Sequence, residues 1–169
     1  MSGSGAPDTH VDAEGLRVAI VASSWHTEIM DALVASATDT CTRAGALSVL
    51  YRVPGSFELA LAAQVAARAG FDAVVALGVI IRGGTPHFEY VCQATTDGLS
   101  RVALDSGVPL GFGLLTCDDE AQARDRSGLP GSAEDKGREA CEAALALALT
   151  LRTIHRPGGA VATGFAAGD

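Results

Sequence analysis

Short apolar segments alternate along the chain with segments in which apolar residues recur at helical spacing. Four of the apolar segments predict strands, at residues 16–22, 47–53, 73–81 and 108–115. Nearly every position in them is apolar, which is typical of parallel strands covered on both faces. Strands and helices that alternate in this way favour right-handed crossover connections. The pattern therefore predicts an α/β fold, with helices on both faces of a four-stranded parallel sheet.

Helical periodicity is clearest on either side of the last predicted strand. One apolar stripe consists of Phe88, Val91, Cys92, Thr95, Leu99 and Val102. A second stripe consists of Ala140, Ala143, Ala144, Leu147, Leu151 and Ile154. A thinner stripe contains Ile29, Leu33, Ala37 and Cys41. The alanine-rich segment 57–69 favours a helix by propensity.

Three sequence signals mark the starts of helices. Thr116-x-x-Asp119 and Ser132-x-x-Asp135 resemble capping boxes, in which the first residue caps the helix. Thr85 followed by proline predicts a cap with proline at the first helical position. With these starts, the predicted order of elements is βαβαβαβαα.

Composition and charge exclude several classes of protein. The 169 residues fit one domain, and 48% hydrophobic with 19% charged residues exclude a wholly disordered chain. A net charge of −8 has the wrong sign for a protein that binds nucleic acid by neutralising phosphates. No apolar run reaches the ~18–20 residues of a membrane span, and residues 1–15 lack the regions of a signal peptide. We therefore expect a cytoplasmic protein.

The termini and the cysteines carry little sign of chemistry. Residues 1–15 and 157–169 lack periodicity, so we expect flexible ends around a domain that spans residues 16–156. The cysteines have no C-x-x-C spacing, which favours core thiols over a metal or redox site: Cys41, Cys92, Cys117 and Cys141. Lys136 is the only lysine, and an expected place beside solvent argues against covalent catalysis by its amine.

Candidate chemistry gathers where the predicted strands end. In an open parallel sheet, ligands bind beyond the carboxyl ends of the strands. Three loops at that edge carry unusual residues, at positions 23–26, 54–58 and 82–87. Because parallel strands end at the same edge, we expect these loops to converge in space.

The third loop combines a phosphate-binding pattern with a titratable side chain. Gly83-Gly84-Thr85 offers backbone N–H groups, a hydroxyl and a helix start, which favour a phosphate. Glycines at such a turn also occur for backbone reasons alone. His87 is a candidate general acid and base, or only a residue at the start of a helix. The absence of G-x-x-x-x-G-K-[ST] argues against nucleoside triphosphates.

Other residues at this edge have two interpretations each. Trp25 either offers a surface on which a flat heteroaromatic ring stacks or anchors the core. Glu58 either accepts hydrogen bonds from sugar-like hydroxyls or complements a helix dipole. A basic cluster either holds a phosphate or forms a solvated helix face: Arg124, Arg126, Lys136 and Arg138.

Taken together, five segments in chain order resemble the lumazine synthase family. They are VASSWH at 21–26, VPGSFE at 53–58, ALGVIIRGGTPHFEYV at 76–91, GFGLLT at 111–116, and RSG at 126–128 followed by DKGREA at 135–140. The resemblance implies a flavodoxin-like three-layer α/β/α sandwich. It also implies synthesis of 6,7-dimethyl-8-ribityllumazine from 5-amino-6-(D-ribitylamino)uracil and 3,4-dihydroxy-2-butanone 4-phosphate, with release of phosphate and water and without a cofactor or metal.

The resemblance also implies a role for each matched residue. His87 would shuttle protons, and Arg126 would bind the phosphate of the butanone together with Gly83, Gly84 and Thr85. The pyrimidine would stack on Trp25. Its edge and its ribityl chain would be held by Ser56, Phe57, Glu58, Ile80 and Ile81. Phe112 and Lys136 match positions that reach the site across a subunit boundary.

The expected partners are further copies of the chain. The resemblance implies a homopentamer with sites between neighbours, which in some relatives forms decamers or icosahedral shells of 60 chains, and riboflavin synthase as a companion enzyme. No nucleic-acid or membrane partner is expected. The alternative is a non-catalytic flavin-binding, lumazine-binding or shell-forming paralogue on the same fold.

Overall fold

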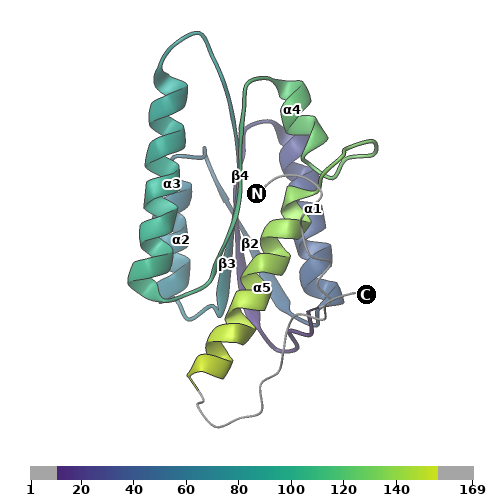
Figure 1. The fold of residues 1–169 in the computed structure, drawn as a ribbon, viewed down its shortest axis with the longest axis vertical. Coiled ribbons are helices and arrows are strands. Elements are labelled where there is room, and N and C mark those ends of the chain that lie inside the picture. The colour runs from purple at the N-terminus through teal and green to yellow at the C-terminus, as the bar shows by residue number, and fades with distance from the viewer. Residues whose placement is uncertain (1–10, 156–169) are drawn as a thin grey trace.

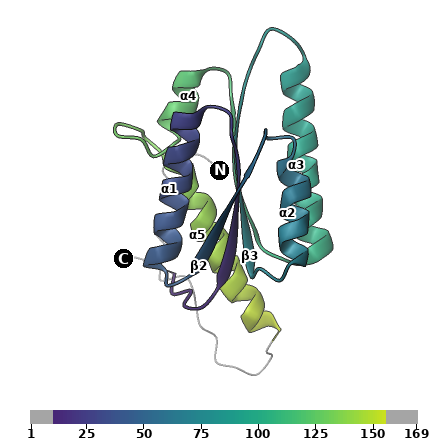
Figure 2. The same cartoon turned by 180° about the vertical axis from the view of Figure 1, so that it is seen from behind.

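The chain folds around one parallel sheet. The computed structural model describes residues 11–155. Its elements are β1 (Arg17–Ser23), α1 (Thr27–Arg43), β2 (Leu47–Val53), α2 (Leu59–Arg68), β3 (Ala73–Ile81), α3 (His87–Ser106), β4 (Leu110–Cys117), α4 (Glu120–Asp125) and α5 (Lys136–Ile154). The four strands lie in the order β2-β1-β3-β4. Helices α2 and α3 cover one face, while α1, α4 and α5 lie on the other (Figures 1 and 2). The α/β/α sandwich and the order of elements are therefore as predicted.

Strand β1 separates two apolar cores. Val18, Ile20 and Ala22 pack in the core beneath α1 and α5, whereas Ala19 and Val21 pack in the core beneath α2 and α3. All five side chains are buried. This alternation fixes the register of the strand, because a shift of one residue would exchange the two faces. The sheet thereby holds the loops at its carboxyl edge in fixed positions.

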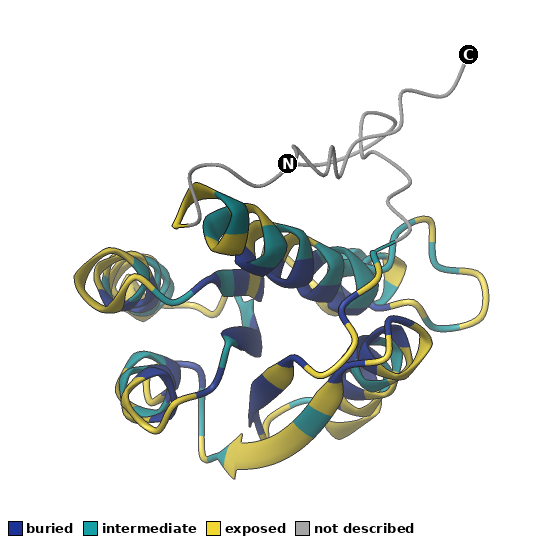
Figure 3. Cartoon of the chain, turned by 90° about the horizontal axis from the view of Figure 1, so that it is seen from below, coloured by how far each residue is buried: buried dark blue, intermediate teal, exposed yellow. Residues whose placement is uncertain are grey.

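Strand β2 departs from the prediction that both faces of each strand are covered. It is an edge strand, and four of its apolar side chains are 43–66% exposed: Leu47, Val49, Leu50 and Tyr51. Seen from below, it is the strand drawn mostly in the colour of exposed residues (Figure 3). The prediction is wrong for this strand in the single chain. A cluster of exposed apolar residues of this size is typical of a surface that another chain covers.

Strand β4 differs from the prediction in where it starts, and helix α5 differs in which face it buries. Strand β4 begins two residues later than predicted, at Leu110, because Pro109 has no N–H to give to a neighbouring strand. Helix α5 buries mainly small residues: Gly137, Ala140, Cys141, Ala144, Leu145 and Ala148. The predicted stripe shares only Ala140 and Ala144 with this set, and Leu147 and Ile154 are exposed. The stripe that sequence analysis assigned to the core therefore lies largely on the outer surface.

Aspartates, rather than the predicted hydroxyl residues, cap two helices. The Asp119 carboxylate accepts a hydrogen bond from the N–H three residues further on (2.8 Å), and Asp135 does the same (2.9 Å). Thr116 lies in β4, and the Ser132 hydroxyl bonds to a backbone carbonyl elsewhere. Thr85 forms no side-chain cap on α3, which begins after Pro86. A carboxylate satisfies free N–H groups and also complements the helix dipole.

Helix α5 lies close to β4 because a glycine faces it. A Cβ atom on Gly111 would stand 2.2 Å from the carbonyl oxygen of Ala140. We expect Gly111→Ala to lower the free energy of unfolding by about 1–3 kcal/mol, because the helix must shift to admit a methyl group. Gly84→Ala is the matched control, since a Cβ there meets nothing within 4 Å. Urea unfolding at one protomer concentration measures the stability of both variants. Equal urea midpoints for Gly111→Ala and Gly84→Ala would contradict this packing.

The cysteines are free thiols, and three of the four are buried. The Sγ atoms of Cys41 and Cys141 lie 3.3 Å apart between α1 and α5. Cys117 is buried at the end of β4, and Cys92 is half-buried on α3. The prediction of core thiols is thus confirmed for Cys41, Cys117 and Cys141.

Packing extends to the first residues that the structure describes. Ala13 is buried, and its N–H donates to the Ala44 carbonyl at 2.8 Å. Val11 packs against the core beneath α1 and α5. The remaining terminal residues, 1–10 and 156–169, lie outside the described part of the chain, and so does the expectation that they are flexible. Between residues 11 and 155, no helix combines the length and the apolar character that a membrane span requires.

Candidate active site at the carboxyl edge of the sheet

Ser24 joins the first two loops of the carboxyl edge. Its hydroxyl donates to the Val53 carbonyl at 2.8 Å, and its N–H points to the Pro54 carbonyl at 3.4 Å. The indole nitrogen of Trp25 lies 3.9 Å from the place where a Cβ on Gly55 would stand. The side chain of Trp25 is 69% exposed. The two loops therefore meet as predicted, and Trp25 presents its ring to solvent instead of anchoring the core.

His26 turns the chain from this loop into α1. Its φ of 58° and ψ of 59° are left-handed, and no other non-glycine residue between 11 and 155 has a positive φ. An L-residue with a side chain adopts this conformation at a cost, so such positions concentrate at functional sites. The turn directly follows Trp25 and fixes the point at which α1 begins.

The second loop combines an anchored serine with two outward residues. The buried hydroxyl of Ser56 donates to the Val79 carbonyl at 3.3 Å, which ties the loop to β3. Glu58 is exposed, and one of its oxygens accepts a hydrogen bond from the Gly55 N–H at 2.9 Å. Phe57 is 63% exposed. Phe57 and Glu58 are therefore open to a ligand, whereas the Ser56 hydroxyl already bonds within the chain, and its contact with a substrate stays a prediction.

Strand β3 runs past the end of its neighbour β1. Their pairing ends at Ala22 and Leu77, whereas β3 continues to Ile81 beside β4. On the β1 side the end of β3 therefore faces no strand. The Arg82 N–H donates to β4, so by alternation the backbone of Ile81 is turned to the open side and that of Ile80 to β4. Unpaired backbone groups at a sheet edge are ready to hydrogen-bond another molecule. This segment supplies a peptide edge between the loops that carry Trp25 and His87.

The third loop is the most open part of the edge. Residues 83–87 are all exposed, and a Cβ on Gly83 or Gly84 would meet nothing within 4 Å. His87 is the first residue of α3. Among the described residues, no hydrogen bond or ion pair involves the side chain of Thr85 or His87. An anion thus has free access to the N–H groups of a helix start, with an imidazole beside them.

The basic cluster separates into paired cations and Arg126. Arg124 and Arg138 each form ion pairs with carboxylates, as expected of a solvated helix face. Arg126 is half-buried at the end of α4 and donates to a backbone carbonyl of that helix at 3.0 Å. No carboxylate of residues 11–155 lies within ion-pair distance of it. A half-buried guanidinium without a counter-charge favours binding of an anion.

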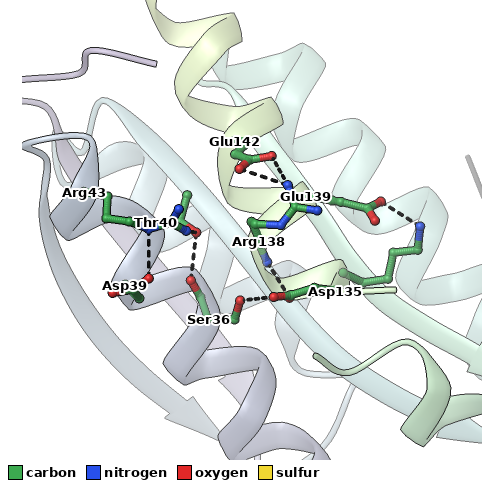
Figure 4. Close-up of polar contacts among 9 residues, drawn as sticks. Ser36, Asp39, Thr40, Arg43, Asp135, Arg138, Glu139 and Glu142 are labelled. Atoms are coloured by element: carbon green, nitrogen blue, oxygen red, sulfur yellow. Dashed lines mark hydrogen bonds and ion pairs between the residues drawn. The ribbon is translucent and has the colours of Figure 1, made fainter. Parts of the chain in front are cut away.

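The start of α5, where Lys136 lies, is fixed by α1. Asp135 accepts a hydrogen bond from Ser36 of α1 while it caps α5 (Figure 4). The Lys136 ammonium lies 2.6 and 2.7 Å from the carboxylates of Glu134 and Glu139, and its side chain is 15% exposed. The expectation that Lys136 lies beside solvent is therefore wrong. Partial burial lowers the pKa of Lys136, but the two carboxylates raise this pKa by more, so the amine is charged at neutral pH.

The family of the chain follows from its likeness to known proteins. A family model described as 6,7-dimethyl-8-ribityllumazine synthase matches residues 15–152. The chain belongs to this family. A protein of that name from Leifsonia xyli subsp. xyli is 63% identical over 157 residues, which cover 92% of this chain and 99% of the relative. Relatives of the same name from Streptomyces coelicolor and Kineococcus radiotolerans are 57% and 59% identical, and the matches cover 93% and 91% of this chain and 99% and 96% of theirs.

One chain does not gather all the residues that the lumazine synthase resemblance assigns to the site. Phe57 follows the edge strand β2, whereas Phe112 lies in β4, at the opposite edge of the sheet. Phe112 is 46% exposed, although it sits in the middle of its strand. An exposed aromatic ring in this position is available to a neighbouring molecule.

Arg82 is the residue of this edge to which the sequence analysis gave no role. Its guanidinium forms ion pairs with Glu89 and Asp118 and lies over the ring of Phe88. A charged residue directly after a buried strand was the signal that could have marked it. Its partners come from two other segments, which sequence spacing alone does not bring together.

Proposed function

We propose that this chain condenses 5-amino-6-(D-ribitylamino)uracil with 3,4-dihydroxy-2-butanone 4-phosphate to form 6,7-dimethyl-8-ribityllumazine, phosphate and water. One observation carries the proposal: an open anion-binding turn with His87 at its end shares one edge of the sheet with the exposed ring of Trp25. Membership of the lumazine synthase family supports this choice of reaction.

The pyrimidine is assigned to the aromatic part of the edge. The exposed rings of Trp25 and Phe57 offer flat apolar surfaces on which a heteroaromatic ring stacks. At the end of β3, the unpaired backbone of Ile81 offers a donor and an acceptor to the polar edge of the ring, and Ile80 lies beside it. The exposed carboxylate of Glu58 accepts hydrogen bonds from hydroxyl groups of the ribityl chain.

The butanone phosphate is assigned to the open turn. The N–H groups of Gly83 and Gly84, the Thr85 hydroxyl and the Arg126 guanidinium bind its phosphate. The pyrimidine's own amine attacks the ketone carbon, and His87 takes up the proton that the nitrogen loses and returns it to the departing oxygen as water leaves. A protein amine is not needed as the nucleophile. The charged Lys136 acts instead as a fixed positive group.

We infer that the active unit is a homopentamer in which a neighbour supplies Phe112 and Lys136. A groove of about 440 Å³ between β2 and α2 supports this inference, and it is lined chiefly by apolar residues, including Tyr51, Val53, Leu61, Val65 and Phe71. Leu61 and Val65 are 68% and 58% exposed in the single chain. Burial of such a surface favours association, because apolar area leaves water.

Light scattering of the purified protein measures the assembly directly. We expect a mass of about five times the 17.1 kDa of one chain, or a multiple of that pentamer. Leu61→Glu should shift the protein toward smaller species, because it places a charge in the apolar groove. A wild-type mass of one chain at micromolar concentration would contradict the shared site.

The proposed reaction is tested by following lumazine absorbance after the two substrates are mixed with the protein. The expected result is product formation well above the rate in buffer, with the product identified by chromatography. Folded protein that binds a lumazine analogue yet forms product no faster than buffer would support the non-catalytic paralogue instead.

A further inference from the structure

The segment that carries His87 has little support from the core. Helix α3 buries Thr95, Leu99 and Val102, all of which lie beyond its first two turns. Residues 83–87 are exposed, and the two glycines among them touch no side chain within 4 Å of their Cβ positions. The position of the imidazole therefore depends on contacts made at the two ends of this turn.

Arg82 makes those contacts from the end of β3. Its Nε donates to the Asp118 carboxylate at 2.8 Å, and its guanidinium also pairs with Glu89 in the first turn of α3. The guanidinium carbon lies 4.2 Å from the centre of the Phe88 ring. The Arg82 N–H donates to the Cys117 carbonyl at 2.9 Å. Arg82 thus holds both residues that follow His87 and joins them to the turn after β4.

We propose that Arg82 is a positioning residue that sets the place of the His87 imidazole for the reaction proposed above, on which this inference rests. Direct phosphate binding by Arg82 is the competing role. Two carboxylates already neutralise its charge, whereas Arg126 has no such partner among residues 11–155. The planar guanidinium also donates to two carboxylates through its N–H groups while its flat face lies over the Phe88 ring, which a compact ammonium cannot do.

The contacts of Arg82 matter more for position than for folding. Its side chain is 45% exposed, and the two carboxylates are exposed as well. Exposed ion pairs contribute little to stability, so the fold should survive their loss. A displacement of about 1 Å at a reacting group can nevertheless slow catalysis about 100-fold. Removal of Arg82 should therefore appear in turnover before it appears in stability.

Steady-state kinetics of Arg82→Ala and Arg82→Lys test the inference. We expect kcat to fall about 10- to 100-fold in the alanine variant and to fall clearly in the lysine variant, because one ammonium cannot contact both carboxylates and the ring. Arg101→Ala is the matched control. Arg101 is an 82% exposed arginine on α3, the helix that begins with His87, and its guanidinium lies 3.9 Å from the Asp105 carboxylate. Its loss should change kcat by less than about twofold.

The same substitution in a His87→Ala background separates positioning from direct binding. If Arg82 acts through His87, Arg82→Ala should change the kcat of His87→Ala by less than about twofold. An undiminished loss in that background, or full activity of Arg82→Lys, would overturn the inference. If Arg82→Ala does not fold, Asp118→Asn is the second variant, because it weakens one contact of Arg82. It should also lower kcat, and an unchanged kcat would overturn the inference.

The outcomes also separate this inference from the proposed function. A folded wild type that is no faster than buffer refutes both. An active wild type together with an Arg82→Ala variant as fast as Arg101→Ala refutes the role of Arg82 alone.

Discussion

His87→Ala is expected to lower kcat for lumazine formation by about 10- to 10⁴-fold, the range that removal of a general acid–base produces. The KM values for both substrates should change by less than about threefold, because the His87 side chain forms no hydrogen bond or ion pair with residues 11–155 that would hold the turn in place. Some activity should remain, since the pyrimidine amine attacks the ketone without help from the protein once both substrates are bound side by side.

His155→Ala is the control for this experiment. His155 is an exposed histidine at the end of α5, and its ring nitrogen lies within hydrogen-bond distance of a carbonyl of its own helix. Its removal should leave kcat unchanged within about twofold. If His87→Ala raised KM for the butanone phosphate and kept kcat, the imidazole would be a ligand and not a proton shuttle.

Arg126→Ala is expected to raise KM for 3,4-dihydroxy-2-butanone 4-phosphate by about 10- to 100-fold, because it removes a charge-assisted contact that exists before chemistry begins. The KM for the pyrimidine should stay within about twofold. Inorganic phosphate should compete with the butanone phosphate in the wild type and should compete much less well in the variant.

Arg124→Ala is a close control for this substitution. Arg124 lies two residues away on α4 and has the same charge, but Glu28 and Glu120 already pair with it. Its loss should change the butanone phosphate KM by less than about twofold. Equal effects of the two substitutions would show that general positive potential, and not a site at Arg126, attracts the phosphate.

Buried elements were the most predictable part of the fold. The apolar residues of β1, those of β3 as far as Val79 and the thin stripe of α1 are buried, because two cores in the same chain surround them. Strand β2 has the same apolar pattern yet is exposed, since it is an edge strand that the other elements of residues 11–155 leave largely uncovered. The pattern identifies surfaces that avoid water. It does not say whether the covering surface belongs to the same molecule.

Helix α5 shows a second limit of periodicity. Gly137 and Ala140 face the core because a close approach to Leu33 and to Gly111 leaves no room for larger side chains. The larger Leu147 and Ile154 then fall on the outside, where hydropathy alone does not place them. Close backbone contacts of this kind depend on how α5 packs against α1 and β4, which the spacing of apolar residues does not reveal.

The candidate site was predictable where a loop follows a strand directly. Trp25 and His87 stand where the strand ends place them, and both are exposed as a ligand requires. The environment of Lys136 was only partly predictable. Glu139 lies three residues further along the same helix, whereas Glu134 meets the amine from the irregular segment before α5. The contacts of Arg82 depend in the same way on the meeting of β3 with the turn after β4.

We propose that the carboxyl edge of this sheet is a lumazine synthase active site. The most direct measurement is the initial rate of lumazine formation by the wild type at neutral pH, with both substrates saturating, beside buffer and His87→Ala. We expect a wild-type rate far above buffer and at least about tenfold above the variant. A wild-type rate equal to that of buffer, from folded and assembled protein, would contradict it.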